Sequence, residues 1–474
     1  MVSDLNMFGR IVIKSDAEEI TDDNILDELR AAMDDHIINR SKIEYLWKYY
    51  RGEQPILYRK KKIRPEICNK IVENRANEIV SFKVGYLCGE PIQYVGRNSN
   101  NGVSKGVAEL NEMMFSENKA SQDKEIVEWM MICGTSYRLV LPDIAKNEDE
   151  APFEMYTLDP RDSFVVYSNG IGNKRLFGVK YCTDKKGIDT FSIYTKNHYW
   201  LIRDNKIIES KDHALGMIPI FEYPANNARL GVFEIVLPLL DALNNTASNR
   251  MDGIEQFIQA FIKFINCDID EEKFAALKEM GAIRVKSTEG ANADVDIVSQ
   301  ELNQGQTQIT KEDIYQSILT ICGMPNRNGG SSTSDTGAAV IMRDGWSDAE
   351  ARAKDSELMF KKSEQEVLKL ILRILRDTDG LSKEIYSLRL RDIDMKFTRR
   401  NYDNIQSKSQ VLVSMLQNGK IHPRLAFTSS GLFSDPENAY QLSMEYAEEQ
   451  AKKVIGKQGG NDPDKTNNND KIEQ

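Results

Sequence analysis

The sequence lacks most of the residues and motifs that catalysis needs. Its 474 residues include only four histidines, none close to another, so His-x-x-x-His metal spacing is absent. It has neither a G-x-x-x-x-G-K-[ST] phosphate loop nor a Gly-x-Ser-x-Gly elbow. Six scattered cysteines form no Cys-x-x-Cys pair, which predicts buried, reduced thiols in a cytosolic protein. We therefore expect no enzyme, no catalytic residue, no cofactor and no bound metal.

Long apolar runs and excess basic charge are also missing. No segment approaches about 18 consecutive apolar residues, so we expect no membrane span, and the first residues do not resemble a secretory signal. With 73 acidic and 62 basic residues the net charge is −11, which disfavours simple gripping of DNA phosphates. The basic run from Arg59 to Arg64 could bind nucleic acid, but a solvated loop between two helices is the favoured interpretation.

Hydrophobic spacing predicts a mainly helical α+β chain, with 41% hydrophobic residues and room for about three domains. Helices are predicted over 21–51, 66–87 and 105–133. Short β-rich runs follow between 134 and 224, separated by turn residues, so the first 225 residues form one α+β unit. These runs are Tyr137–Leu141, Phe164–Tyr167, Phe177–Tyr181, Phe191–Tyr194 and Tyr199–Ile202.

A long helix is predicted from Gly231 to Asn266, with an apolar stripe that includes Met251, Ile258 and Ile265. A small module follows over 268–305, with a helix at 271–280 and strands at 282–286 and 295–298. The chain returns as a helix over 311–322. After a Gly/Ser/Asn-rich loop at 326–336 comes a further long helix over 338–378.

The C-terminal part is predicted to begin with a strand of alternating pattern over 387–401. Helices are predicted over 403–418, 423–430 and 436–453. Residues 456–474 lack apolar periodicity and read as a disordered tail.

A helix of about 35 residues would be about 50 Å long and could not bury its apolar stripe on itself. Two explanations stay open. One is that identical copies in an oligomer cover the stripe, and the other is that the returning helix covers it in an intramolecular hairpin.

Several blocks, in this order along the chain, resemble the portal proteins of tailed phages and prophages of Gram-positive bacteria. They span nearly the whole sequence, whereas 266–305 and the tail show no such block. The blocks are Tyr50-Arg51-Gly52-Glu53-Gln54-Pro55-Ile56, Asn69–Asn74, Lys83–Ile92, Leu158–Asp162, Ile218–Phe221, Leu240–Asn244, Thr336–Ala339, Gly345–Arg352 and Phe397–Asn401.

The resemblance implies a ring, usually of twelve subunits, at one capsid vertex. Residues 1–230 would form the wing, 231–265 and 306–325 the stem helices, and 266–305 the clip. Residues 326–336 would be the tunnel loop, 337–386 the long helix of the wing, and 387–455 the crown. The protein would be found in the virion and, during assembly, in the host cytoplasm.

The same resemblance implies partners and contact residues. The clip would dock the terminase large subunit and later the head–tail adaptor, and the ring would also meet major capsid and scaffolding proteins, with no membrane. The charged clip residues are Glu271, Glu272, Arg284, Lys286, Asp294 and Asp296. The loop facing double-stranded DNA, without sequence specificity, would comprise Arg327, Asn328, Gly329, Gly330, Ser331, Ser332, Thr333, Ser334, Asp335 and Thr336.

The loop is nearly uncharged, because only Arg327 and Asp335 carry charge, and its glycines let the backbone adapt. A neutral or acidic channel wall would let DNA slide, whereas a basic wall would hold it. Two other functions stay open: an enzyme of head morphogenesis such as a metal-dependent nuclease, and a scaffold or docking protein that forms no pore.

Overall fold

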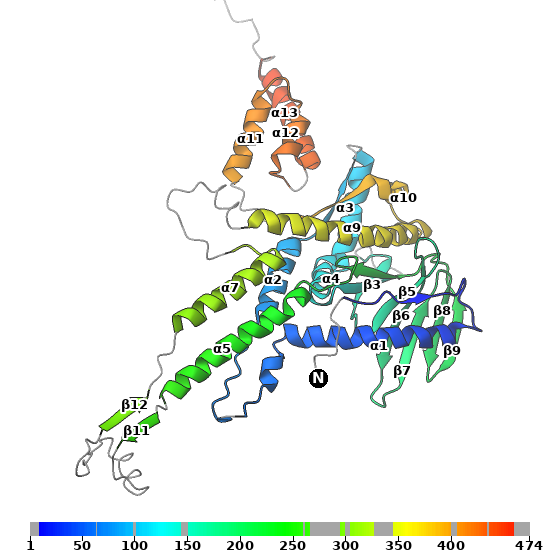
Figure 1. Cartoon of the computed structure of the whole chain (residues 1–474). Helices are drawn as coiled ribbons and strands as arrows, with labels where there is room; N and C mark the ends of the chain where they lie inside the picture. Colours follow the sequence, from blue (N-terminus) through cyan, green and yellow to red (C-terminus); the bar gives the residue numbers. More distant parts are fainter. Residues whose placement is uncertain are drawn as a thin grey trace, which may run out of the picture.

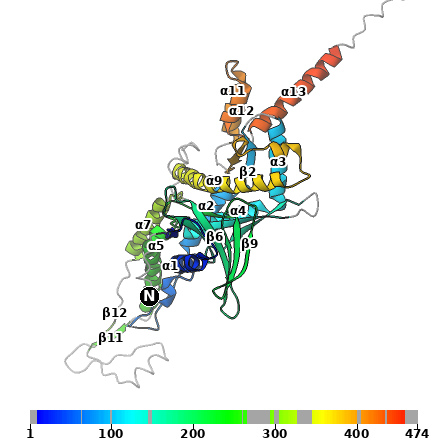
Figure 2. The same cartoon turned by 90° about the vertical axis from the view of Figure 1, so that its right-hand side faces the viewer.

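The computed structural model shows an elongated α+β subunit with a projecting arm (Figures 1 and 2). It describes residues 9–62, 64–97, 101–143, 150–258, 261–265, 294–298, 304–326, 345–399, 405–433 and 436–458. In the arm, α5 (Leu237–Ile258) and α7 (Gln304–Cys322) run side by side toward the strand pair β11 (Phe261–Ile265) and β12 (Asp294–Val298). Helices α11 (Ile405–Gln417), α12 (Pro423–Ser430) and α13 (Pro436–Gln458) lie on the other side of α9 (Trp346–Asp377).

Two main sheets form the body. A three-stranded sheet has the order β10-β3-β4, and a six-stranded sheet has the order β1-β5-β6-β7-β8-β9, in which β1 alone pairs in parallel. The strands are β1 (Lys14–Ser15), β3 (Thr135–Pro142), β4 (Phe153–Leu158), β5 (Ser163–Ser168), β6 (Arg175–Thr183), β7 (Asp189–Tyr194), β8 (His198–Arg203), β9 (Lys206–Asp212) and β10 (Ile220–Pro224). A separate pair joins β2 (Gln93–Gly96) to β13 (Ile393–Lys396).

The body has two apolar cores. One lies between the six-stranded sheet and α1 (Ile25–Tyr50), and Leu29, Phe164 and Trp200 all belong to it. The other gathers α2 (Arg75–Cys88), α4 (Lys119–Cys133), the three-stranded sheet and α9, with Phe360 and Leu368 fully buried. Fully burying one such side chain stabilises the fold by about 1.5–3 kcal/mol. These two cores fix α9 and the root of the arm relative to the sheets.

Helix ends follow local chemistry where the predictions succeed. Helix α1 ends at Tyr50, and Gly52 follows with φ 97°, as the predicted stop required. The prediction of one helix over 105–133 is wrong. The segment forms α3 (Asn101–Ser116) and α4, because Asn118 takes the left-handed conformation with φ 53° between them.

The predicted helix over 231–266 is also wrong at both ends. A 3-10 turn (Glu234–Val236) precedes α5, and Pro238 lies in the first turn, where a missing N–H costs no bond. Residues Phe261–Ile265 form β11 instead, with alternating Ile, Lys and Phe side chains that suit a strand. The predicted strand at 295–298 is confirmed as part of β12, whereas 271–280 and 282–286 lie outside the described residues.

In the arm, the returning helix covers part of the apolar stripe that is predicted on the long helix. Helix α7 starts at Gln304, earlier than predicted, and packs along α5, where the Arg250 guanidinium donates to Gln308 Oε1 at 2.7 Å. The intramolecular hairpin is therefore confirmed. Met251 and Ile309 nevertheless stay 42% and 60% exposed, so the hairpin covers the arm only in part.

The C-terminal helices are confirmed with small shifts, and α13 continues to Gln458, so residues 456–458 are helical rather than disordered. The predicted strand over 387–401 shrinks to β13. Ahead of it lie α10 (Lys383–Ser387) and a 3-10 turn (Leu390–Asp392). Ser382 caps α10 by accepting from the Ile385 N–H at 3.2 Å, which a strand pattern could not foresee.

The described cysteines form no disulfide, and Cys133 and Cys322 are buried as predicted. Cys182 is exposed on β6, which contradicts the expectation of burial. None of the helices within the described ranges combines the length and apolar character of a bilayer-crossing segment.

Stability should fall in mild acid because of His36. Its Nε2 donates to the Arg161 carbonyl at 3.0 Å, and burial lowers its pKa from 6.5 to about 4. Between pH 6.5 and pH 4, His36 is protonated in the unfolded chain but neutral in the folded chain. The stability that its neutral form gives is therefore present above pH 6.5 and lost as pH falls toward 4. We expect a loss of about 2–3 kcal/mol from this residue.

Urea unfolding at pH 7 and pH 4.5 measures this loss. The variant H36Q keeps an amide donor but does not titrate, so its free energy of unfolding should fall less between the two pH values. Equal losses in both proteins would contradict the role of His36.

Candidate functional site

Most residues predicted to contact partners lie outside the described residues. This applies to the whole loop from Arg327 to Thr336 and to Glu271, Glu272, Arg284 and Lys286. Asp294 and Asp296 lie on β12 at the tip of the arm, where Asp294 stands opposite Ile265 and Asp296 opposite Lys263. Only the strand at 295–298 of the predicted clip is confirmed, because its partner β11 lies in the predicted stem, and what these carboxylates bind stays a prediction.

The two ends that flank residues 327–344 are fixed beside each other. Lys83 donates to the Gly323 carbonyl at 3.3 Å, and Arg352 donates to the Ile321 carbonyl at 3.0 Å. Both cations thus bind the carbonyls that α7 leaves unpaired at its C-terminal end. A side chain at Gly345 would lie only 3.8 Å from the Met324 carbonyl oxygen. The described residues that flank this segment are therefore held beside each other, at a place that we call the loop anchor.

Burial shapes the electrostatics of the loop anchor. It lowers the pKa of Lys83 to about 8, and it raises the pKa of the adjacent Cys322 thiol to about 11. A hydrogen-bonded but partly desolvated lysine of this kind serves to hold α7 against α2.

Aromatic and charged side chains connect the loop anchor to the start of α9. Tyr86 on α2 donates to Glu350 Oε2 at 2.9 Å, and Arg399 donates to Glu350 Oε1 at 2.7 Å and also to Glu357. The rings of Phe82 and Tyr86 lie within 6.1 Å of the Trp346 ring. Three blocks of the portal resemblance, far apart in sequence, therefore meet at one junction.

A second junction lies at the root of the arm, where residues 69–74 run extended along α5; we call this segment the strap. The backbone N–H groups of Asn69, Ile71 and Glu73 donate to the side chains of Asp252, Ser248 and Asn244, at 2.7, 3.0 and 2.8 Å.

The periods match. Four helical residues rise about 6 Å, which is close to the span of two extended residues. Each acceptor on α5 therefore meets every second N–H group of the strap, and these bonds explain why the predicted helix at 66–87 begins only at Arg75.

Amide side chains close the root of the arm. Asn244 donates to Gln54 Oε1 at 2.5 Å, Gln54 donates to Asn74 Oδ1 at 3.1 Å, and Asn74 donates to the Tyr50 carbonyl at 2.8 Å. Tyr49 donates to Asp241 Oδ1 at 2.9 Å, and burial raises the pKa of that carboxyl. Three further blocks of the resemblance thus meet here.

The basic run from Arg59 to Arg64 is partly neutralised. Lys61 and Arg59 lie 2.5 and 3.3 Å from Asp252 Oδ2 on α5, while Lys60 and Lys62 are exposed. Burial raises the pKa of Asp252, but Lys61 and the Asn69 N–H lower it by more than burial raises it. The net pKa is therefore below its usual value, and the carboxyl stays ionised. The run is therefore a loop fastened to the arm rather than a fully solvated one.

Only one arrangement among the described side chains resembles a catalytic triad. His198 Nδ1 lies 2.6 Å from Asp212, and its Nε2 lies 2.7 Å from Ser210 Oγ. However, Ser210 donates to Asp22 at 3.1 Å, and a carboxylate beside this hydroxyl would destabilise a developing oxyanion.

Trp200 also donates to Asp22, at 2.6 Å, and lowers its pKa. The arrangement therefore fastens the segment before α1 to the sheet. Within the ranges that the structure describes, no group of His, Cys, Asp and Glu is placed to hold a metal ion.

Comparison with known proteins identifies the family of the chain. Residues 31–455, which are most of the chain, match the family model described as "Phage portal protein, SPP1 Gp6-like". The class is that of the phage portal proteins, which are structural and non-enzymatic. The chain belongs to the SPP1 Gp6-like family of these proteins.

No curated protein sequence matches the chain. Among solved structures it is similar to a chain in the "Neck of empty GTA particle computed with C6 symmetry". The identity is 12%, the TM-score is 0.43, and the match covers 75% of this chain and 90% of that one.

Proposed function

We propose that twelve copies of this chain form a ring at one capsid vertex that conducts double-stranded DNA during packaging and ejection. Membership of the portal family over residues 31–455 carries this proposal. The arm would line the channel as the stem, β11 and β12 would belong to the clip, and α11–α13 would form the crown.

Incomplete burial in the crown supports an assembly. Among the described residues, its helices bury only Leu412, Ala426 and Phe427 as a core. Large apolar side chains of the same helices remain exposed and are available to a partner. They include Val411, Val413, Leu416, Leu425, Leu442, Met444 and Tyr446.

The loop anchor supports a role for residues 327–336 at the channel. The described residues on either side of this segment are held at the loop anchor, which lies where the arm meets the body, so the segment would face the channel if the arm lines it. Its neutral hydroxyl side chains and glycines suit transient contact with moving phosphates, and a subunit charge of −11 disfavours tight binding.

The clip would dock the terminase large subunit and then the head–tail adaptor, and the outer surface would meet capsid and scaffolding proteins. Terminase would supply the ATPase, which fits the missing phosphate loop in this chain. The ring would function in the virion and form in the host cytoplasm.

Electron microscopy of the purified chain tests the proposal. We expect annular particles with a central hole wide enough for a DNA duplex. Compact monomers only, at micromolar concentration in near-physiological buffer, would overturn it. Incubation with plasmid DNA and magnesium or manganese should leave the DNA uncut, whereas cleavage would favour a nuclease.

A further inference from the structure

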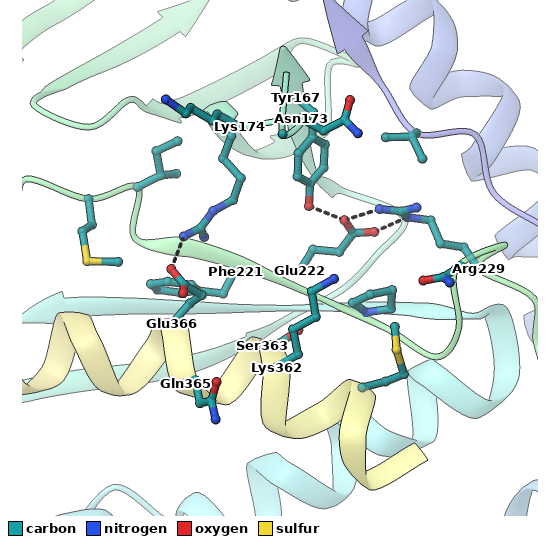
Figure 3. A pocket seen from close by; sticks show the side chains of 18 of the residues that line it. Tyr167, Asn173, Lys174, Phe221, Glu222, Arg229, Lys362, Ser363, Gln365 and Glu366 are labelled. Carbon is teal, nitrogen blue, oxygen red and sulfur yellow. Dashed lines mark hydrogen bonds and ion pairs between the residues drawn. The ribbon is translucent and has the colours of Figure 1, made fainter. Parts of the chain in front are cut away.

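A cleft of about 850 Å³ opens between the six-stranded sheet, β10 and α9 (Figure 3). The turn between β5 and β6 forms one wall, the loop at 226–229 another, and residues 359–366 of α9 a third. None of the junctions that hold the arm and the loop anchor uses this cleft.

The carboxylates inside the cleft are already paired. Glu222 accepts from Arg229 at 2.5 and 2.8 Å and from Tyr167 at 2.5 Å. Burial raises the pKa of Glu222, but Arg229 lowers it by more than burial raises it, so the carboxyl stays ionised. Glu366 lies 3.7 Å from Arg175, which also covers the Phe221 ring at 4.6 Å.

Four lysines on the rim of the cleft are not paired with any described carboxylate. Lys14, Lys174, Lys196 and Lys362 come from four different elements, are exposed, and have no acidic partner among the described residues. Four uncompensated positive charges around one concave site are notable on a chain whose net charge is −11. Such a site attracts carboxylates or phosphates.

The lining favours carboxylates on a polypeptide over nucleic acid. Met217, Ile218 and Met359 make part of the lining apolar, which suits side chains from a protein surface. Nucleic-acid bases would need free aromatic faces. Here Arg175 covers the Phe221 ring, and the Tyr167 hydroxyl is bound to Glu222.

A matching acidic surface lies at the opposite edge of the three-stranded sheet. The sheet order β10-β3-β4 puts the cleft at the β10 edge and β4 at the other. Glu117, Glu125 and Glu154 lie along β4, where Glu117 accepts from the Met155 N–H at 3.1 Å; we call these three the β4-edge patch. None of the three forms an ion pair with a described residue, and burial together with neighbouring carboxylates raises the pKa of Glu117 and Glu125.

We infer that the lysine-rimmed cleft of one copy receives the β4-edge patch of the next copy. A ring closes through heterologous contacts, in which one surface of a subunit meets a different surface of its neighbour. Two complementary charged surfaces at opposite edges of one sheet meet that requirement. This inference rests on the proposed ring.

Charge reversal tests the pairing. K174E/K362E changes the cleft, E125K/E154K changes the patch, and a third variant carries all four changes. Sedimentation velocity at micromolar concentration in 150 mM NaCl then measures the ring fraction. We expect each double variant to lose at least fivefold in ring fraction, and the combined variant to regain at least half of the wild-type value, because every contact again joins opposite charges.

The control K185E/K206E reverses exposed lysines outside the cleft and should assemble like the wild type. Thermal unfolding of each variant checks that the subunit is folded. Assembly of both double variants like the wild type, or no recovery in the combined variant, would overturn the inference while leaving the ring intact.

Two further outcomes separate this inference from the proposed function. Charge-dependent dimers without rings would support the pairing and contradict the ring, and no self-association at all would overturn both. Salt-resistant binding of a labelled 20-nucleotide single strand, lost in K174E/K362E, would instead assign the cleft to nucleic acid and overturn the inference.

Discussion

Replacing Glu364 with glutamine should lower the free energy of unfolding by about 3–5 kcal/mol. This carboxylate on α9 is fully buried, and it accepts from Arg138 at 2.9 Å and from Tyr94 at 2.5 Å, as well as from Tyr223. Lys119 lies 3.2 Å away. Its loss would leave a buried positive charge without compensation.

The network around Glu364 is neutral only when complete. Arg138 on β3 also donates to Asp123 at 2.5 Å, and Lys119 donates to the same carboxylate, so two cations face two anions. These four residues connect α4, β3 and α9 inside one core. A glutamine keeps the shape but turns an NH₂ group toward donors, which adds unpaired polar groups to the lost charge.

Urea unfolding at pH 7 measures the effect, and E366Q, a partly exposed position on the same helix, should change stability by less than about 1 kcal/mol. Burial raises the pKa of Glu364, but Lys119 and Arg138 lower it further, to about 2. Its stabilisation is therefore present above pH 4.5 and lost as pH falls toward 2, so wild type and E364Q should converge there. Equal stability at pH 7 would contradict the role of this charge.

Local signals in the sequence predicted the elements that local chemistry controls. The five β-rich runs all became strands, because alternating aromatic and β-branched residues fit a half-buried sheet. The strands β1, β2, β4, β9, β10 and β11 are not predicted. β9 carries the charged run Lys206–Asp212 and is almost entirely exposed, so its sequence shows no apolar face.

Local sequence patterns could not predict the elements whose structure depends on distant partners. Ile67 and Ile71 have helical spacing, yet the N–H groups of the strap bond to side chains on α5, over 170 residues away. The same holds for the end of α5, where pairing with β12 decides that Phe261–Ile265 is a strand. Tertiary pairing overrides local propensity in both cases.

Two features of the fold nevertheless leave a signal in the sequence. Glu364 interrupts the apolar face of α9 four residues after Phe360 and before Val367, which marks a charge directed into the core. A polar stripe repeats every four residues on α5, at Asn244, Ser248 and Asp252. The rest of this helix is largely apolar. By contrast, the lysines of the cleft come from four separate elements, and no spacing in the sequence joins them.

Replacing Gly329 and Gly330 together with proline should leave rings intact but reduce DNA-filled heads more than a hundredfold. This rests on the proposed function. Proline fixes φ and removes the N–H donor, so the loop would lose both its adaptability and the donors that the proposal assigns to phosphate contact. Ring formation should survive because the loop anchor, held by Lys83 and Arg352 on the Gly323 and Ile321 carbonyls, is untouched.

The matched control G329A/G330A keeps both N–H donors and much of the backbone freedom, so it should package close to the wild-type amount. Nuclease-protected DNA per head measures packaging, and electron microscopy of the same preparations counts rings. Normal packaging in G329P/G330P would show that this segment does not act on DNA. Loss of rings would show instead that it holds neighbouring subunits together. Because the loop anchor fixes both ends of the segment in every subunit, a stiffened loop in a ring would act on the duplex from all sides at once. A large effect therefore follows from a small change in each copy.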